Sequence, residues 1–376
     1  MRNQEIKFND SCQRYSIIIG NNLFGVLQKK IRLICPNTKQ IAIIYDSKVP
    51  SKFRDALKSK LRNYKITFLK FNANEKTKSF ESVEFYINKL LQGNFNRSDL
   101  VIAVGGGIVG DTVGFVASIF KRGINFINLP TTLLAQVDSA IGGKTGINSI
   151  YGKNLIGSFY QPEMVISDTS TLNSLPKREV TCGYAEILKH ALILDKKLFF
   201  WLQKNGKKIL NLNNKIVIQK AIYQSCKIKA KIVEKDETEK DLRMILNFGH
   251  TFGHAFEATT NFSNKINHGE SVLLGMLCAA EFAFRNKILK SKDFNLIKEH
   301  YSVLNLPNKI NDYFTKKDVK NIIQFMKSDK KNSDSKIKLI LISKIGKTLK
   351  SRSLEDSVLK NYLNSKLFWK LNYNYL

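Results

Sequence analysis

Three of the five histidines in the chain lie within nineteen residues of one another. Residues 246–254 read Leu-Asn-Phe-Gly-His-Thr-Phe-Gly-His and contain His250 and His254, and His268 follows in Asn-His-Gly-Glu. Neutral imidazole is a common ligand of zinc and similar ions, and histidines four residues apart share one helical face. No glutamate lies between His250 and His254, so this is not the HExxH motif of zinc proteases. The segment predicts a different metal site, and ordinary core or surface histidines are the alternative.

A site of two histidines and one carboxylate leaves coordination positions open for substrate, as a catalytic zinc requires. The best carboxylate candidate is Glu186, in Gly-Tyr-Ala-Glu-Ile-Leu-Lys at residues 183–189. This segment is typical of a mostly apolar helix, in which an unpaired charge would be costly. Spacing alone does not establish Glu186 as the third ligand, and it also offers His254 as a further one.

A glycine-rich segment, Gly-Gly-Gly-Ile-Val-Gly-Asp at residues 105–111, lies between a predicted strand at 99–104 and a predicted helix at 111–120. Gly105, Gly107 and Gly110 have the spacing of the dinucleotide fingerprint, whose glycines let the backbone approach a pyrophosphate at the helix N-terminus. The acidic residue that usually follows about twenty positions later is not evident, so the sequence does not establish a plain Rossmann unit. A glycine turn without a ligand is the alternative.

Two adjacent hydroxyls, Thr131 and Thr132, follow Pro130 directly after the next predicted strand, at 125–129. The carboxyl ends of strands are where open α/β sheets bind ligands. Either threonine can instead cap a helix. Two consecutive strand ends that carry ligand-type residues favour a cofactor site.

The elements that must position these residues change in type near residue 175. Apolar, β-branched runs predict strands at 15–20, 40–46, 65–71, 99–104, 125–129 and 164–168. Helical patterns at 81–91 and 111–120 lie between them. This alternation predicts a mostly parallel sheet that is covered on both faces.

After Pro176 the pattern is mainly helical, at 180–195, 215–234, 251–260, 269–286 and 291–301. A small strand is predicted at 336–343, with a turn at Gly346. We therefore expect an α/β dinucleotide-binding domain at 1–175 and a mainly α-helical domain for metal and substrate at 176–376. The pattern assigns no structure to the aromatic-rich stretch 367–376.

Composition excludes several classes of protein. No run approaches the roughly eighteen apolar residues of a membrane span, and the first residues lack the apolar core of a secretory signal. Five scattered cysteines without a CxxC pair indicate reduced thiols, so we expect a cytoplasmic protein. The formal charge of +30 comes from lysines spread over the whole chain without aromatic platforms. We expect no nucleic-acid partner, although this charge can attract an anionic substrate.

Together, the glycine loop, Pro130-Thr131-Thr132, Ala-Glu-Ile-Leu-Lys at 185–189 and Asn-Phe-Gly-His-Thr-Phe-Gly-His at 247–254 resemble the 3-dehydroquinate synthase family of sugar phosphate cyclases. The resemblance runs from about Asp46 to about Lys347. It includes Asp-Ser-Ala-Ile-Gly-Gly-Lys-Thr-Gly-Ile-Asn at 138–148 and Gly-Lys-Asn-Leu-Ile-Gly at 152–157. It implies zinc or cobalt held by Glu186, His250 and His268, and NAD as the second cofactor.

The resemblance also implies two sets of binding residues. The NAD contacts it implies are Asp46, Glu75, Lys78, Gly107, Ile108, Val109, Gly110, Asp111, Thr131, Thr132, Lys144, Lys153, Thr171, Leu172, Asn173 and Ser174. The substrate contacts it implies are Arg122, Asp138, Lys144, Asn154, Lys189, Lys229, Arg243, Asn247, His254 and Lys330, the last chosen over Lys331. Arg122 resembles the family residue that acts in the neighbouring subunit's site, which implies a homodimer.

One position departs from the family pattern. Where the family usually has Gly-Glu before the NAD-contacting lysine, this chain has Asn74-Glu75, which puts the local turn in question.

The reaction that the resemblance implies belongs to the shikimate pathway, which leads to chorismate and the aromatic amino acids. The enzyme is a lyase that converts 3-deoxy-D-arabino-heptulosonate 7-phosphate to 3-dehydroquinate and phosphate. Transient oxidation by NAD, with the metal as Lewis acid, precedes phosphate elimination, reduction and aldol closure. Proton transfer is assigned by the resemblance to Glu239 and His254, with Lys144 and Asn154 also at the reacting groups. Glu239 lies in a charged run, where a solvated turn carboxylate is the alternative.

Three other functions remain open. A related cyclase would make an inosose or a valiolone-type carbocycle, but Arg243 and Lys229, as partners for a carboxylate, favour dehydroquinate. A metal-dependent polyol dehydrogenase would accumulate NADH. A non-catalytic basic binding protein is disfavoured because every motif of the site is present.

Overall fold

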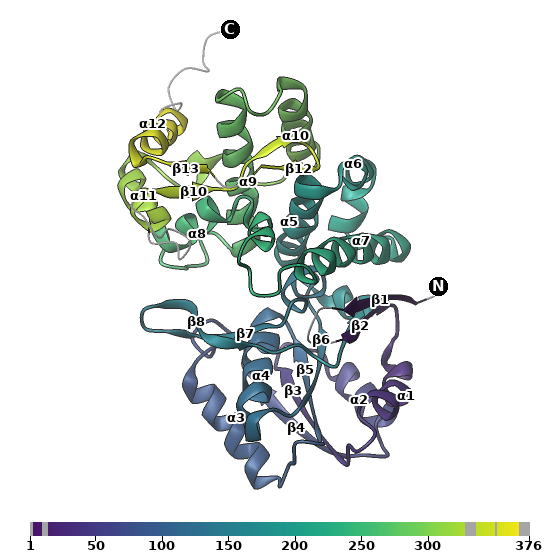
Figure 1. Cartoon of the computed structure of the whole chain (residues 1–376). Coiled ribbons are helices and arrows are strands. Elements are labelled where there is room, and N and C mark those ends of the chain that lie inside the picture. Colours follow the sequence, from purple (N-terminus) through teal and green to yellow (C-terminus); the bar gives the residue numbers. More distant parts are fainter. Residues whose placement is uncertain (1–2, 10–13, 328–335, 350–351, 368–376) are drawn as a thin grey trace. The chain divides into compact units, whose positions relative to one another are not determined.

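The computed structural model describes residues 3–9, 14–327, 336–349 and 352–367 (Figure 1). The chain forms two compact units. The first unit contains residues 1–183 and 211–243, and the second contains residues 184–210 and 244–376. Each unit is described by itself below.

A seven-stranded sheet forms the centre of the first unit. Its order is β1 (Gln4–Asn9), β2 (Arg14–Gly20), β9 (Met164–Asp168), β6 (Asn125–Pro130), β5 (Leu100–Gly105), β3 (Gln40–Asp46) and β4 (Lys65–Phe71). Only the β1–β2 pair is antiparallel, and the other pairs are parallel. The predicted mostly parallel sheet is confirmed.

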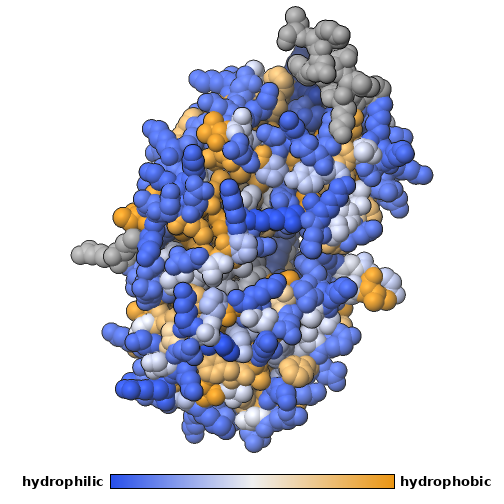
Figure 2. Space-filling view, turned by 180° about the vertical axis from the view of Figure 1, so that it is seen from behind, coloured by the Kyte–Doolittle hydropathy of each residue, from blue (hydrophilic) through white to orange (hydrophobic). Residues whose placement is uncertain are grey.

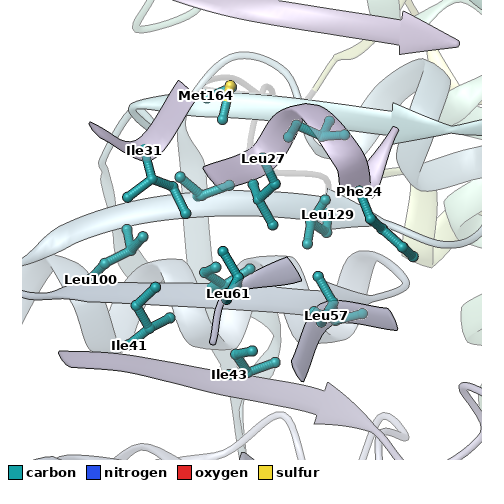
Figure 3. Packing of buried hydrophobic residues seen from close by; sticks show 14 of the residues in the cluster. Phe24, Leu27, Ile31, Ile41, Ile43, Leu57, Leu61, Leu100, Leu129 and Met164 are labelled. Atoms are coloured by element: carbon teal, nitrogen blue, oxygen red, sulfur yellow. The ribbon is translucent and has the colours of Figure 1, made fainter. Parts of the chain in front are cut away.

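Helices cover both faces of this sheet because alternate residues of its strands point to opposite sides. From β3, Ile41 and Ile43 pack against α1 (Phe24–Ile34) and α2 (Ser51–Lys60), as Figure 3 shows. The intervening Ala42 and Ile44 pack in the other core, with α3 (Phe80–Gln92) and α4 (Gly107–Ile119). Both faces of the sheet are covered by apolar side chains, so the polar residues that could bind a ligand are expected at the ends of its strands.

Smaller elements complete the first unit. A hairpin of β7 (Lys144–Ser149) and β8 (Gly152–Phe159) packs against α4, and α7 (Lys215–Val233) packs against β1, β2 and η2 (Ala135–Ser139) (Figure 1). The 3-10 turns η1 (Phe120–Arg122) and η3 (Thr169–Ser174) follow α4 and β9.

The second unit is mainly helical. It contains most of α5 (Lys177–Leu194), α6 (Lys196–Leu210), α8 (His250–Thr259), α9 (His268–Arg285), α10 (Ser291–Val303), α11 (Val319–Lys327) and α12 (Asp356–Leu367). The short turns are η4 (Leu242–Asn247), η5 (Ile310–Asp312) and η6 (Lys316–Asp318), the first of which begins in the first unit. Two small antiparallel pairs join β10 (Ile337–Leu339) to β13 (Arg352–Leu354) and β11 (Ile342–Lys344) to β12 (Lys347–Thr348). The helical character predicted for the second half is confirmed.

Some boundaries differ from the sequence-based prediction. The helix predicted at 111–120 begins four residues earlier, at Gly107, because the glycine segment forms its first turn. The strand predicted at 336–343 is two short strands, β10 and β11, and Gly346 forms the turn to β12 with a φ of +82°.

The face shown in Figure 2 is largely hydrophilic, with scattered apolar residues. Within the described residues, no helix has the length and apolar character that a membrane span needs. Cys35, Cys182, Cys226 and Cys278 are buried free thiols, as expected, and Cys12 lies outside the described residues.

Candidate active site

Glu186 occupies an unusual position for a carboxylate, because its side chain is completely buried in α5. Lys189, three residues later on the same helix, places its ammonium against Oε2. Neither carboxylate oxygen makes a hydrogen bond of regular geometry with a described residue. A buried carboxylate is stable only when it is paired or coordinates a metal, so a single ion pair leaves Glu186 able to accept a further cation.

Two imidazoles face the remaining oxygen of Glu186. Nε2 of His250 lies 3.6 Å from Oε1, and Nε2 of His268 lies 3.7 Å from it. One ligand atom from each of the three residues lies within 4.8 Å of the others. Tetrahedral ligands at zinc bond lengths of roughly 2.0–2.1 Å are about 3.4 Å apart. The predicted metal residues therefore fit a divalent ion.

The other ring nitrogen of each histidine is held by an oxygen. Nδ1 of His250 lies 3.3 Å from the carbonyl oxygen of Phe248, and Nδ1 of His268 lies 3.0 Å from Oε2 of Glu257. With the ring proton on Nδ1, each Nε2 could offer its lone pair to a metal ion beside Oε1 of Glu186. Histidine ligands of metals characteristically have such oxygen partners.

The electrostatics of the cluster favour a cation. Burial opposes the charge of Glu186, but Lys189 and the two imidazoles outweigh burial and hold the pKa of this carboxyl well below its usual range. Burial lowers the pKa of His250, which is therefore neutral. Burial also opposes the protonation of His268, but Glu257 and Glu186 outweigh it and raise the pKa to about 10. Carboxylates that stabilise a positive imidazole in this way also attract a metal ion.

Close packing of α8 on α9 holds the two histidines together, since His250 begins α8 and His268 begins α9. Gly249 precedes His250 with a φ of +81°, in the left-handed region that glycine adopts without strain. A Cβ on Gly275 of α9 would lie 2.1 Å from the carbonyl oxygen of Gly249. Only glycine permits this approach. At the start of α9, Asn267 and Glu270 form a capping box that fixes its first turn.

His254 lies on α8 one turn after His250, and its side chain is exposed. The ring centroids of His254 and His268 are 6.3 Å apart. Nitrogens of these two rings and an oxygen of Glu257 lie within 4.8 Å of one another. His254 therefore lies beside the predicted metal residues, where it can exchange a proton.

In the first unit, the glycine loop follows β5 and leads directly into α4, whose N-cap is Gly106. The first backbone N–H groups of a helix lack partners within the helix and carry a partial positive charge. A Cβ on Gly105 would lie 2.5 Å from Cγ2 of Val109, and one on Gly110 would lie 3.0 Å from Nδ2 of Asn128 on β6. The glycines therefore let strand and helix pack closely and leave the first turn open to a phosphate.

The predicted residues at neighbouring strand ends lie at the same edge of the sheet. Asp46 ends β3, while Thr131 follows β6 and donates its N–H to Gly105 O at 2.8 Å. Oγ1 of Thr132 accepts the N–H of Ala135 at 3.1 Å, so this threonine does cap a helical turn. Residues Thr171 to Ser174 lie in η3, directly after β9.

A polar cluster joins this edge to the β7–β8 hairpin. Nζ of Lys78 lies 2.6 Å from Oδ2 of Asp111 and also contacts Oδ1 of Asn154. Burial raises the pKa of Asp111 despite the opposing effect of Lys78. The turn that precedes Lys78 is intact without the family glycine, because Oδ1 of Asn74 accepts the N–H groups of Lys76 and Thr77 at 2.9 and 3.1 Å.

Three further predicted cationic residues of the first unit each have an anionic or carbonyl partner. Nζ of Lys229 lies 2.7 Å from Oδ1 of Asp138, and Lys144 pairs with Glu239. Nη2 of Arg243 donates to Gly142 O at 3.1 Å. These side chains are held in place by partners that an anionic ligand would share or replace.

Arg122 is not brought together with these residues. It lies in η1, before β6, and is therefore at the amino ends of the parallel strands, whereas the glycine loop is at their carboxyl ends. Its φ is +65°, and it lines an open cavity of about 610 Å³ with Arg97 and Tyr160. Lys330 and Lys331 lie outside the described residues.

Comparison with known families decides among the possible enzymes of this fold. A model described as 3-dehydroquinate synthase N-terminal matches residues 68–182, and one described as 3-dehydroquinate synthase C-terminal matches residues 183–332. This chain belongs to the 3-dehydroquinate synthase family. It is therefore an enzyme, and the predicted family is confirmed.

A curated relative agrees with the assignment to the 3-dehydroquinate synthase family, and two solved structures are similar in fold. The 3-dehydroquinate synthase of Pelagibacter ubique is 52% identical over 364 residues, covering 96% of this chain and 98% of the relative. A 2-deoxy-scyllo-inosose synthase, solved with carbaglucose-6-phosphate, NAD+ and Co2+, is 26% identical with a TM-score of 0.86, covering 97% and 100%. ValA, the 2-epi-5-epi-valiolone synthase of Streptomyces hygroscopicus, solved with NAD+ and Zn2+, shares the fold at 22% identity and a TM-score of 0.83, covering 97% and 99%.

Sequence reasoning missed several residues that support this 3-dehydroquinate synthase site. Glu257 lies seven residues after His250, two turns along the same helical face, and that spacing was a usable signal. Asn148 and Asp236 gave no comparable signal, because their partners are backbone groups and side chains that only folding brings near.

Proposed function

We propose that this chain converts 3-deoxy-D-arabino-heptulosonate 7-phosphate to 3-dehydroquinate and phosphate. The observation that carries the proposal is the Glu186–His250–His268 cluster, in which both Nε2 atoms face one buried carboxylate oxygen. It occurs in a chain 52% identical to a curated 3-dehydroquinate synthase. Arg243 and Lys229 supply the cationic partners that the substrate carboxylate needs.

The metal would be held by Glu186, His250 and His268, and NAD by the glycine loop and the strand-end residues around it. When bound, the metal supplies Lewis acidity and NAD supplies reversible oxidation. The first turn of α4 would bind the pyrophosphate through its N–H groups, and Glu75, Lys78 and Asp111 would orient the nucleotide. Lys153, paired with Glu75 at 3.3 Å, lies with them.

The proton transfers are assigned to this chain's own residues. His254 is exposed beside the metal residues and has a titratable imidazole, so it can accept or return a proton. Glu239 pairs with Lys144, so its carboxylate lies beside another predicted site residue, where it can accept a proton. Asn154 and Asn247 donate hydrogen bonds that fix the substrate's orientation.

The decisive experiment measures phosphate release and 3-dehydroquinate formation from the heptulosonate phosphate, with and without a chelator. We expect both products in equal amounts, loss of both with the chelator, and no net change in NADH absorbance. Cyclisation of a sugar phosphate that lacks the carboxylate, without any 3-dehydroquinate, would instead establish an inosose- or valiolone-forming enzyme. Stoichiometric NADH would establish a polyol dehydrogenase.

We also propose that the chain acts as a homodimer in which Arg122 serves the site of the other copy. The support is its position at the opposite edge of the sheet from the glycine loop. Among the described residues, no hydrogen bond or ion pair engages the Arg122 guanidinium, which is exposed.

Complementation tests the shared arginine. Arg122→Ala and His250→Ala should each be inactive, but a hybrid dimer regains one complete site. Random mixing should therefore restore about a quarter of the activity. Mixtures that stay inactive although hybrid dimers form would show that Arg122 acts within its own subunit.

A further inference from the structure

Asn148, near the end of β7, makes four hydrogen bonds with three residues of the proposed site. Its backbone N–H donates to Lys78 O at 2.8 Å. Its Nδ2 donates to the carbonyl oxygen of Glu75 at 3.0 Å and to Oε2 of Glu75 at 2.8 Å. Its Oδ1 accepts the N–H of Asn154 at 3.0 Å. One half-buried side chain thus joins the turn before α3 to both strands of the hairpin.

The segments that Asn148 joins have little regular structure to hold them. Glu75 and Lys78 lie in an irregular stretch between β4 and α3, outside the sheet. Asn154 has a φ of +54°, in the left-handed region that asparagine adopts more readily than most other non-glycine residues. Without the Asn148 side chain, Lys78 would keep its side-chain contact with Asn154 and its backbone bond, but Glu75 and the backbone of Asn154 would lose this support.

Only a side-chain amide satisfies these partners, because it offers two donors and an acceptor from one position. Aspartate could accept from Asn154 but would place a second carboxylate against Oε2 of Glu75. Alanine would remove all three side-chain bonds. The contacts therefore specify the residue type as well as its place.

We propose that Asn148 is a positioning residue that fixes Glu75, Lys78 and Asn154 for the bound nucleotide and substrate. This inference rests on the proposed function, since it takes Glu75 and Lys78 as NAD contacts. It adds a residue that touches neither ligand and acts through the residues that do.

The test measures NAD+ binding by calorimetry in the absence of substrate, together with the metal content and thermal midpoint of each variant. Asn148→Ala should raise the Kd for NAD+ about tenfold or more, with metal content unchanged, and Asn148→Asp should raise it further. Tyr151→Ala is the matched control, because this side chain is 87% exposed at the turn of the same hairpin. It should bind NAD+ as the unaltered chain does.

A reciprocal exchange separates positioning from a general loss of stability. In the double variant Asn148→Asp, Glu75→Gln, the amide and carboxylate trade places, so the side-chain hydrogen bond is restored with its direction reversed. In the Glu75→Gln background, Asn148→Asp should raise the Kd for NAD+ at least fivefold less than it does in the unaltered chain. An unchanged Kd in Asn148→Ala, or an equal effect of Asn148→Asp in the two backgrounds, would overturn the proposal.

The experiments distinguish a failure of the proposed reaction from a failure of the proposed role of Asn148. A chain that binds NAD+ but forms no 3-dehydroquinate would overturn the proposed reaction and leave the Asn148 exchange fully measurable by binding. A chain that does not bind NAD+ at all would overturn both.

Discussion

Nδ1 of His268 lies 3.0 Å from Oε2 of Glu257, while Nε2 of the same ring lies 3.7 Å from Oε1 of Glu186. The imidazole is thus held between two carboxylates, one on each nitrogen. Glu257 fixes the ring orientation and increases the electron density on Nε2, which makes this nitrogen a better metal ligand. Glu257 would therefore shape the proposed metal site without contacting the metal.

Replacement of Glu257 by glutamine should weaken metal binding without unfolding the protein. The amide keeps the shape of the side chain but loses the charge that polarises His268, and changes of this kind cost about 10–100-fold in metal affinity. Competition with a coloured chelator measures the effect. Glu299→Gln, on the exposed side of α10, is the control and should bind metal normally. Equal affinities in the two variants would exclude the proposed role of Glu257.

Gly275→Ala should separate α8 from α9 and disturb the metal residues. The added methyl would lie 2.1 Å from Gly249 O, and relief of such overpacking typically costs about 1–3 kcal/mol. Urea unfolding and metal retention on a desalting column measure the two consequences. Gly25→Ala in α1 is the matched control, because its Cβ would meet no atom within 4 Å. This control variant should be about 0.4–1 kcal/mol more stable to unfolding than the unaltered chain, because alanine restricts the unfolded chain.

Protonation of His300 should make the free energy of unfolding depend on pH. Burial lowers the pKa of His300 to about 4, with its Nε2 2.9 Å from the hydroxyl of Tyr184. Between pH 6.5 and 4 the unfolded chain therefore binds the proton more strongly, and stability falls as the pH falls. The loss approaches roughly 3 kcal/mol at pH 4, at about 1.36 kcal/mol for each pH unit.

Chemical unfolding at several pH values, with excess chelator in every sample, measures this dependence. His300→Gln should flatten the slope between pH 6.5 and 4 relative to the unaltered chain. An identical slope in the two proteins would mean that His300 is not protonated on unfolding.

Asp236→Ala should lower kcat/KM. Expressed as a free energy, this loss should exceed the loss in the free energy of unfolding. Its two carboxylate oxygens accept the backbone N–H groups of Lys240, Asp241 and Arg243 at 2.8, 2.8 and 2.9 Å, which fixes the loop that carries Glu239 and Arg243. Displacement of catalytic groups by about 1 Å can cost about 100-fold. Asp241→Asn is the control, because only the backbone of Asp241 takes part in this loop. If kcat/KM fell equally in both variants, loop charge rather than loop geometry would be responsible.

The sequence predicted best the strands that consist of continuous apolar residues. The runs 40–46 and 164–168 match β3 and β9 at both ends, because parallel strands covered on both faces consist of continuous apolar residues. The run 65–71 also matches the edge strand β4, which is only partly buried. The hairpin of β7 and β8 was missed because it is partly exposed and rich in glycine, lysine and asparagine. In α2 only Phe53 and Leu57 are buried, too few to give a helical period.

Within the site, the sequence pointed to the groups that would contact a metal or a nucleotide. It could not identify the residues that hold those groups, because the pairs depend on the folded path of the chain. Asn148 and Glu75, for example, are 73 residues apart.

The pairing of Glu186 with Lys189 has a consequence for how the enzyme is supplied with its ion. The ammonium balances the buried carboxylate whether or not a metal is present, so an apo chain carries no uncompensated charge in α5. Lys189 holds Oε2 while the two Nε2 atoms face Oε1, so an ion would take the oxygen that the lysine leaves open. We therefore expect that the chain can lose and regain its ion after folding, with metal availability helping to decide which ion it carries.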